Sequence, residues 1–200
     1  MNSARQNLKS LKNDGDIIMS TTAKEYVYPS SLKRIEPQPG QDSVWDYPKP
    51  PSYDPVTSHI RIEFNGEIIA ETDRAIRTLQ TGIPPVYYIP REDVRTDYLT
   101  LTEQHSHCPY KGDADYWTVQ VGERTASNIA WSYPDPLPEA MSIKDYVAFY
   151  AHAVQATVDG EKAEPPTWKW IGGWVTSNIV GPFMAQDDIP RAETLQNINK

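Results

Sequence analysis

One short turn in the second half of the chain gathers several side chains that can do chemistry. The segment His107–Gly112 contains a thiol on Cys108, a phenol on Tyr110 and an ammonium on Lys111, and Trp117 follows closely. The proline and the glycine in this segment favour a tight turn. A thiol, a phenol and an ammonium held together at a turn could bind a small molecule and transform it. We therefore look for the function of the protein here.

Cys108 and Lys111 each have a chemical and a structural interpretation. A neighbouring cation, either Lys111 or a protonated His107, would favour the nucleophilic thiolate form of Cys108. The alternative is an inert thiol beside a turn, because no His-Asp relay at a diagnostic spacing accompanies it. Lys111 could hold a carboxylate or a phosphate, or act as a base when desolvated. The alternative for Lys111 is a solvated turn lysine.

Charged residues and histidines near this turn leave further alternatives open. Arg91 and Asp93 follow a β-prone run, and one of them could face inward and pair with Lys111 or with a ligand. A structural salt bridge at the end of the strand is the alternative. His105 and His107 would share one face of an extended segment and could join a metal site. Zinc sites usually have four ligands, at sequence spacings that are easier to recognise than this one. We therefore interpret both histidines as polar loop residues and predict no metal.

Five aromatic residues could surround a ligand. An aromatic cage would suit a flat or cationic molecule, whereas a core of large rings is the structural alternative. Tyrosine and tryptophan often keep their polar ends at a cavity, so we expect a mixture of both roles. The five residues are Tyr88, Tyr110, Trp117, Trp131 and Tyr133.

Composition and charge exclude several classes of protein. The net charge of −8 and the pI of about 5.0 have the wrong sign for binding nucleic acid through a general basic field. No apolar run approaches the roughly 18 residues of a membrane helix, and Ile17–Met19 is shorter than a signal-peptide core of about 7–15 residues. The only cysteine cannot form an internal disulfide. We therefore expect a cytoplasmic protein without a nucleic-acid or membrane partner.

The elements that must position the candidate residues are mostly β-strands. Residues 60–64 alternate apolar and polar side chains, and Asn65-Gly66 then provides a two-residue turn into residues 67–70, which predicts a hairpin. Residues 116–130 and residues 153–163 predict two more hairpins. Residues 75–79 could form a strand or a helical turn, and residues 86–89 form a short β-prone run. One main helix is expected over 139–150.

The chain divides into three parts. Residues 1–42 are rich in Asn, Ser, Lys, Asp and Gln and predict a flexible arm. Residues 43–184 predict a single, mostly β, α+β domain, and residues 185–200 a loose tail. On the arm, Tyr26–Pro29 could dock on the domain or on a second subunit, as in a homo-oligomer, or could be a chance aromatic cluster. The tryptophans around Gly172-Gly173 predict that residues 171–183 pack back on the sheet.

Six separated motifs resemble, in their order, the domain-of-unknown-function 427 family. The resemblance covers roughly residues 44 to 184 and implies a β-tent fold, similar to methionine sulfoxide reductase B and to the ligand domain of cereblon. Several of those relatives hold a structural zinc with paired cysteines, which this chain lacks, so we expect a fold without structural zinc. The motifs are Trp45-Asp46-Tyr47-Pro48, Phe64-Asn65-Gly66-Glu67, residues 84–94, Cys108–Gly112, residues 130–134, and Gly172-Gly173-Trp174 with residues 180–183.

The resemblance also implies which residues serve the site. Met184 stands where the family commonly has a lysine, and Gln80 where an acid is common, so a ligand that touched either residue would differ here. The family also bears a nucleotidyltransferase label, but the chain has no Gly-Ser followed by paired acids and no phosphate-cradling glycine loop. The polar residues that carry over are Tyr88, Arg91, Asp93, Cys108, Tyr110, Lys111, Trp117, Trp131 and Tyr133.

Taken together, the sequence predicts a domain that binds a small, aromatic or anionic organic molecule. Lys111, Arg91 and Tyr110 would be its polar anchors, and the Lys111 amine and the Arg91 guanidinium would face one ring-walled hollow. As an enzyme, the domain would perform cofactor-free isomerisation, cyclisation or elimination, with Lys111 or Tyr110 transferring protons and Arg91 steadying an enolate. Cys108 completes the candidate catalytic set. The alternatives are a non-catalytic ligand-binding module and a protein-interaction module, and a nucleotidyltransferase is the least favoured.

Overall fold

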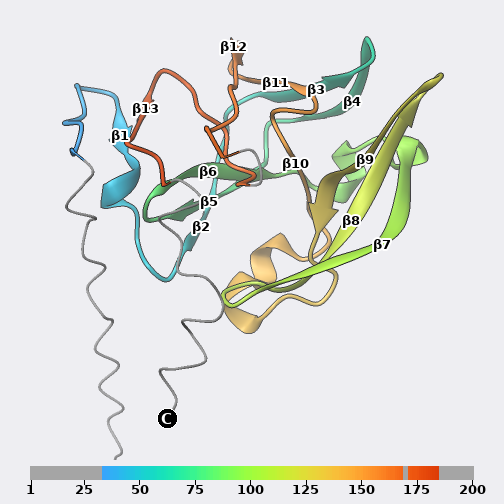
Figure 1. The fold of residues 1–200 in the computed structure, drawn as a ribbon, viewed down its shortest axis with the longest axis horizontal. Coiled ribbons are helices and arrows are strands. Elements are labelled where there is room, and N and C mark those ends of the chain that lie inside the picture. The colour runs from blue at the N-terminus through green and yellow to red at the C-terminus, as the bar shows by residue number, and fades with distance from the viewer. Residues whose placement is uncertain (1–32, 169–170, 185–200) are drawn as a thin grey trace, which may run out of the picture.

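A computed structural model describes residues 33–168 and 171–184, and β-strands dominate this part of the chain (Figure 1). The predictions for the arm up to residue 32, including Tyr26–Pro29, and for the tail from residue 185 lie outside the described residues. The strands are β1 Asp42–Ser43, β2 Ser52–Pro55, β3 Ile60–Phe64, β4 Glu67–Thr72, β5 Ile76–Gln80, β6 Ile83–Tyr88, β7 Leu99–Cys108, β8 Gly112–Val121, β9 Arg124–Ser132, β10 Val147–Phe149, β11 Gln155–Val158, β12 Glu161–Lys162 and β13 Ile179–Val180.

Short 3-10 helices supply the helical content of the described residues. They are η1 Val44–Asp46, η2 Arg91–Asp93, η3 Thr96–Tyr98 and η4 Pro138–Ile143. None of the helices in the described ranges has the length and apolar character to cross a membrane.

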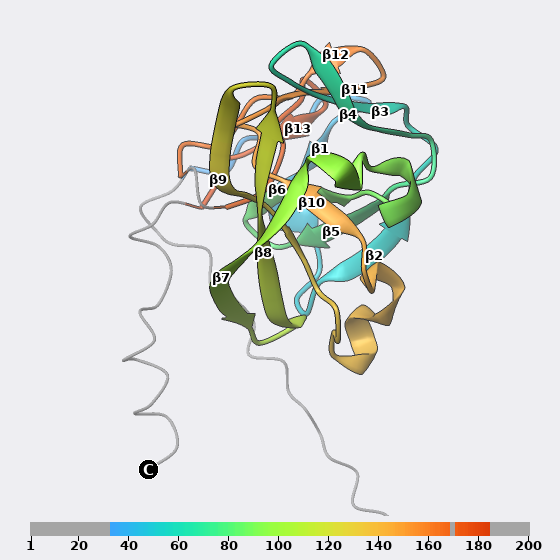
Figure 2. The same cartoon turned by 90° about the vertical axis from the view of Figure 1, so that its right-hand side faces the viewer.

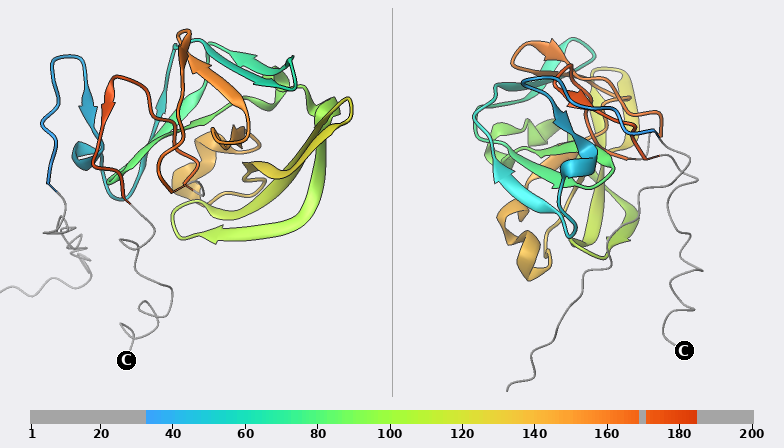
Figure 3. Two further views of the ribbon diagram at one scale, coloured as in Figure 1. Left: turned by 45° about the horizontal axis from the view of Figure 1, so that its top comes forward. Right: turned by 90° about the vertical axis from the view of Figure 1, so that its left-hand side faces the viewer.

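The strands form antiparallel sheets with one parallel pair. The orders are β10-β9-β8-β7, β12-β11-β3-β4 and β2-β5-β6, and β1 pairs with β13 in parallel. The long strands β7, β8 and β9 curve along one side of the domain, which faces the viewer in Figure 2, and β1 and β13 lie together at the opposite end (Figures 1 and 3). The predicted mostly β fold built from antiparallel hairpins is confirmed.

All three predicted hairpins form. Strands β3 and β4 meet at Asn65 and Gly66, which have φ values of 51° and 82°. This left-handed pair matches the twist of the strands, as expected for an Asn-Gly turn. Asp159 and Gly160 form the same left-handed two-residue turn between β11 and β12, with φ values of 50° and 82°. The ambiguous segment 75–79 is a strand, since most of it lies in β5.

The predicted helix over 139–150 is wrong beyond its first turns. Helix η4 ends at Ile143, and Asp145 takes a left-handed φ of 62°. The chain then enters β10, which pairs with β9 and is completely buried. The apolar residues at 146–150 match helical spacing only because a buried strand is apolar on both faces. Met141 is half exposed, so η4 has no continuous apolar stripe.

Two clusters of buried side chains make up most of the core. The first lies between the sheets and includes Ile60, Phe149 and Trp174, and the second includes Tyr88 and Trp131. The Trp174 ring lies 5.2 Å from that of Tyr87, and its Nε1 donates a hydrogen bond to the Phe149 carbonyl at 2.9 Å. The expectation that the segment after residue 171 packs back on the domain is therefore confirmed.

Candidate functional site

The turn that holds Cys108 and Lys111 is the connection between β7 and β8. The Lys111 amide donates to the Cys108 carbonyl at 3.2 Å, and Gly112 takes a left-handed φ of 95°. The Leu137 amide donates to the Lys111 carbonyl at 3.0 Å. The segment before η4 therefore packs directly on this turn, as the closeness of the two in Figure 1 illustrates.

Lys111 is buried, with 6% of its surface exposed. Burial lowers the pKa of its amine, and the neighbouring Cys108 opposes this shift. Among the contacts between described residues, none gives the Lys111 side chain a carboxylate partner. An amine held out of water without an opposite charge is costly and favours the neutral form. The alternative of a solvated turn lysine is therefore wrong.

Six tyrosines belong to the second core cluster or pack against it, as does the half-buried, free Cys108 thiol, and Tyr53, Tyr88 and Tyr133 are three of them. The rings of Tyr88 and Tyr133 lie 6.3 Å apart. Burial raises the pKa of Tyr53 to about 12, with smaller contributions from Cys108 and Glu139. It raises the pKa values of Tyr88 and Tyr133 still further. All three phenols therefore stay protonated and can act as hydrogen-bond donors. We name Tyr53, Tyr88, Cys108, Lys111 and Tyr133 the Lys111 cluster.

A cavity of about 420 Å³ lies beside the turn. Tyr53 connects it to the Lys111 cluster, because its ring lines the cavity while its hydroxyl donates to the Tyr110 carbonyl at 3.3 Å. Apolar and aromatic side chains dominate the walls, and one carboxylate stands among them. The lining residues are Pro50, Pro51, Tyr53, Pro109, Tyr110, Leu137 and Glu139.

Arg91 lies with Trp117 rather than with Lys111. Its guanidinium sits 4.8 Å above the Trp117 ring, whose Nε1 donates to the Ser132 hydroxyl at 3.0 Å. Trp117 packs against the first core cluster, whereas Cys108 packs against the second. Within the described part of the chain, no contact joins Arg91 to Lys111. The structure therefore brings Arg91 together with Trp117 and assembles the Lys111 cluster separately.

Trp131 is a core residue in this arrangement. Its ring meets Tyr88 edge-on at 6.3 Å and lies 4.5 Å from the ring of Tyr150. With 6% of its surface exposed, it supports the tyrosines of the Lys111 cluster from behind.

Asp93 closes a strand end, as one of the two sequence alternatives predicted. Its carboxylate accepts from Arg74 Nε at 3.0 Å, from Arg74 Nη2 at 2.8 Å and from the Thr72 hydroxyl at 2.7 Å. The hydrogen bond from Arg74 is the main reason that the pKa of Asp93 is lowered from 3.8. The partner is thus Arg74, a residue that the sequence analysis did not single out.

We expect the Asp93→Asn substitution to lower the free energy of unfolding by about 1 kcal/mol at neutral pH, because charge-assisted bonds are lost beside a half-exposed arginine. A carboxylate with a lowered folded pKa stabilises above its unfolded pKa of about 3.9, and this contribution disappears as the pH falls through the folded value. Urea unfolding of both proteins, at neutral pH and below the folded pKa, measures the difference. The control is Glu92→Gln, since Glu92 contacts Arg74 from an exposed position. Equal effects of the two substitutions would contradict this account.

His105 and His107 form cross-strand pairs. Their Nδ1 atoms lie 2.9 Å and 2.6 Å from carboxylate oxygens of Asp115 and Asp113, which stand directly opposite on β8. Residues 33–168 and 171–184 contain no group of three or more His, Cys, Asp or Glu side chains that could hold a metal ion. Both histidines lie in a strand rather than in a loop, so that part of the prediction is wrong.

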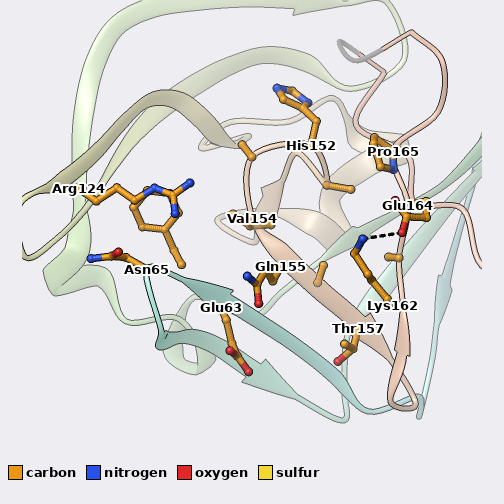
Figure 4. A pocket seen from close by; sticks show the side chains of 15 residues that line it. Glu63, Asn65, Arg124, His152, Val154, Gln155, Thr157, Lys162, Glu164 and Pro165 are labelled. Carbon is orange, nitrogen blue, oxygen red and sulfur yellow. Dashed lines mark hydrogen bonds and ion pairs between the residues drawn. The ribbon is translucent and has the colours of Figure 1, made fainter.

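A larger cavity, of about 580 Å³, lies away from the Lys111 cluster (Figure 4). Arg124 reaches toward its middle from the start of β9, and Lys162 and Glu164 stand on the opposite side. We name it the Arg124 cleft. Sequence analysis missed it, because its walls come from three hairpins and from the segment after β10. The alanines at positions 151, 153 and 156 were the only local signal.

Comparison with known proteins agrees with this fold. Residues 52–160, more than half of the chain, match the family model described as "Domain of unknown function (DUF427)". The chain belongs to the DUF427 family. The matched span includes the Lys111 cluster, Arg91 with Trp117, and Arg124, so these features lie in the DUF427 region of the chain. No curated protein matches the chain.

Proposed function

We propose that this DUF427 protein binds a small organic molecule in the cavity beside the β7–β8 turn, and that Lys111, which belongs to this turn but not to the cavity lining, exchanges protons with it. The observation that carries the proposal is the burial of the Lys111 amine without a carboxylate partner among the described residues. A buried amine without such a partner destabilises the folded protein, and such groups cluster at functional sites. A structural role would be served at lower cost by an apolar side chain of similar length.

The chemistry suited to this site is proton transfer without a cofactor. A neutral amine can accept a proton from a carbon next to a carbonyl group, and a protonated phenol can donate a hydrogen bond to the resulting enolate. Lys111 would play the first role. Tyr53 or Tyr110, which line the cavity, would play the second. Isomerisations, cyclisations and eliminations next to a carbonyl group can proceed through such a step.

The roles of the other candidates follow from their surroundings. Tyr88 and Tyr133 would orient the ligand or Lys111 through their hydroxyl groups, and Cys108 would tune the amine from its half-buried position. Arg91 would steady a ligand only if the ligand reached Trp117, so we give it no role in the proton-transfer step. The proposal places the protein in the cytoplasm, because its single free thiol suits a reducing compartment.

A non-catalytic ligand-binding module is the second candidate. The wall of the cavity favours it, because proline, leucine and tyrosine side chains bind apolar molecules without any chemistry.

A screen of small carbonyl compounds and organic acids tests the proposal. A compound at 100 times its dissociation constant adds about 2.7 kcal/mol to the free energy of unfolding, which a thermal-shift measurement detects. We expect Tyr110→Ala to remove most of this stabilisation, because Tyr110 lines the cavity. Tyr98→Ala is the matched control, since Tyr98 is half-buried under Arg95 and outside the lining. Mass spectrometry of each stabilising compound then separates turnover from binding.

Stabilisation that survives in Tyr110→Ala for every compound would rule out this cavity as the binding site. Binding without turnover would leave the ligand-binding module and remove the enzyme.

A further inference from the structure

The Arg124 cleft combines apolar and polar lining residues with one cation, Arg124, that has no ion-pair partner among the described residues. Its apolar lining includes Phe64, Val154 and Pro165, together with alanines of the segment 151–156. The volume of about 580 Å³ falls in the range of small-molecule sites, which is about 300–1,000 Å³. A cleft with these walls suits the body of an organic molecule.

Arg124 is the group that gives the cleft a charge preference. Its guanidinium lies 4.8 Å above the Phe64 ring, and in Figure 4 it extends from the β9 side toward the middle of the pocket. No salt bridge between described residues includes Arg124. The Phe64 ring covers one face of the guanidinium. The N–H groups at the edge of the guanidinium therefore remain available to bind a carboxylate in a bidentate arrangement.

The other charged groups of the cleft already have partners. Lys162 Nζ lies 2.7 Å from Glu164 Oε1, the contact drawn as a dashed line in Figure 4. Glu63 accepts from Arg61 at 2.6 Å and 2.7 Å. These two pairs leave no net charge, and His152, which also lines the cleft, lies with its ring 5.4 Å from that of Tyr150. Arg124 is therefore the permanent cation that sets the charge preference for a ligand. A single negative group on an apolar body would match this cleft.

We infer that the Arg124 cleft is a second binding site, which takes a small organic carboxylate whose acid group meets Arg124 and whose apolar body lies along Phe64 and the alanine segment. This site is separate from the cavity beside Lys111 and shares no lining residue with it. Gln155, at the centre of the view in Figure 4, supplies an amide that can bind further polar atoms of the ligand.

Titration calorimetry with phenylacetate tests the inference. Phenethyl alcohol and phenethylamine have the same ring and chain length with a neutral or a positive end, so they isolate the effect of the charge. We expect phenylacetate to bind with a dissociation constant of about 1 mM or tighter and the amine not to bind. We also expect affinity to fall as salt is added, because Arg124 is exposed.

Substitutions then assign the site. Arg124→Gln should weaken phenylacetate binding about tenfold, in line with the loss of one charge-assisted contact. The matched control is Arg95→Gln, because the Arg95 guanidinium lies at the same 4.8 Å over a ring, that of Tyr98, outside the cleft. Gln155→Trp should fill the cleft and abolish binding. The unfolding midpoint of the Gln155→Trp protein should equal that of the natural protein, since Gln155 is exposed.

Several outcomes would overturn the inference. These are an amine that binds as well as the acid, unchanged affinity in Arg124→Gln, and no phenylacetate binding at about ten times the expected dissociation constant. Loss of phenylacetate binding in Lys111→Met would place the acid in the other cavity and would also reject the second site. The binding of phenylacetate at Arg124 does not depend on proton transfer by Lys111. If Lys111 has no such role, the results expected here stay the same.

Discussion

The Lys111→Met protein is expected to be more stable than the natural protein by about 1–2 kcal/mol, and inactive toward any compound that the natural protein transforms. Methionine has a similar length and no charge, so the substitution removes the cost of burying an amine while keeping the packing. Loss of a proton-transfer group lowers turnover by about 10²–10⁴-fold. Urea unfolding and mass spectrometry measure the two effects.

The pH dependence provides an independent check on Lys111. A buried lysine with a lowered pKa destabilises the folded protein fully below its folded pKa, and this cost disappears as the pH rises through the unfolded value of about 10.4. The stability gap between Lys111→Met and the natural protein should therefore shrink at alkaline pH. The control is Lys144→Met, since Lys144 is exposed and should change stability by less than about 0.5 kcal/mol. A Lys111→Met protein that is less stable, yet fully active, would remove Lys111 from the mechanism.

Gly172→Ala is expected to destabilise the domain by about 3 kcal/mol or more, because a methyl group there has no room. A Cβ at this position would lie 1.9 Å from Cη2 and 2.6 Å from Cζ2 of Trp131. The indole cannot retreat, since Tyr88 meets it at 6.3 Å and Tyr150 at 4.5 Å. Chemical unfolding of the variant measures the loss.

A double-mutant cycle gives the control for Gly172. Trp131→Phe removes the part of the ring that the new methyl group would strike, so Gly172→Ala should cost less in that background by about 1 kcal/mol or more. Additive effects of the two substitutions would mean that the close contact with Trp131 is not the cause.

Local patterns predicted the hairpins well. The Asn65-Gly66 and Asp159-Gly160 turns follow from residues that accept a left-handed backbone, and each connects strands that are neighbours along the chain. Strand β10 could not be predicted in this way. Its three residues are buried on both faces, so they have no alternation, and the pairing that defines them is with β9. Tertiary packing decides between helix and strand for such a run.

The candidate site was predictable only in part. The turn at residues 108–112 follows from its proline and glycine, and the order of motifs indicated the family. The sequence did not reveal that Arg91 stacks on Trp117, or that Asp93 binds Arg74, because many exposed residues offer a partner for either side chain. Tyr53 was missed altogether, since it lies far from the turn in sequence and meets it only through the pairing of β2 with β5.

The parallel pairing of β1 with β13 has a consequence during synthesis of the protein. Residues 42 and 179 are neighbours in this pair, and Trp174, just before it, fills the core against Tyr87. A growing chain on the ribosome can form its early hairpins, but their apolar faces stay uncovered until the tryptophan emerges. Contacts between segments that are so far apart in the sequence slow folding and prolong the exposure of apolar surface. The newly made protein should therefore depend on chaperones until its last strand is released.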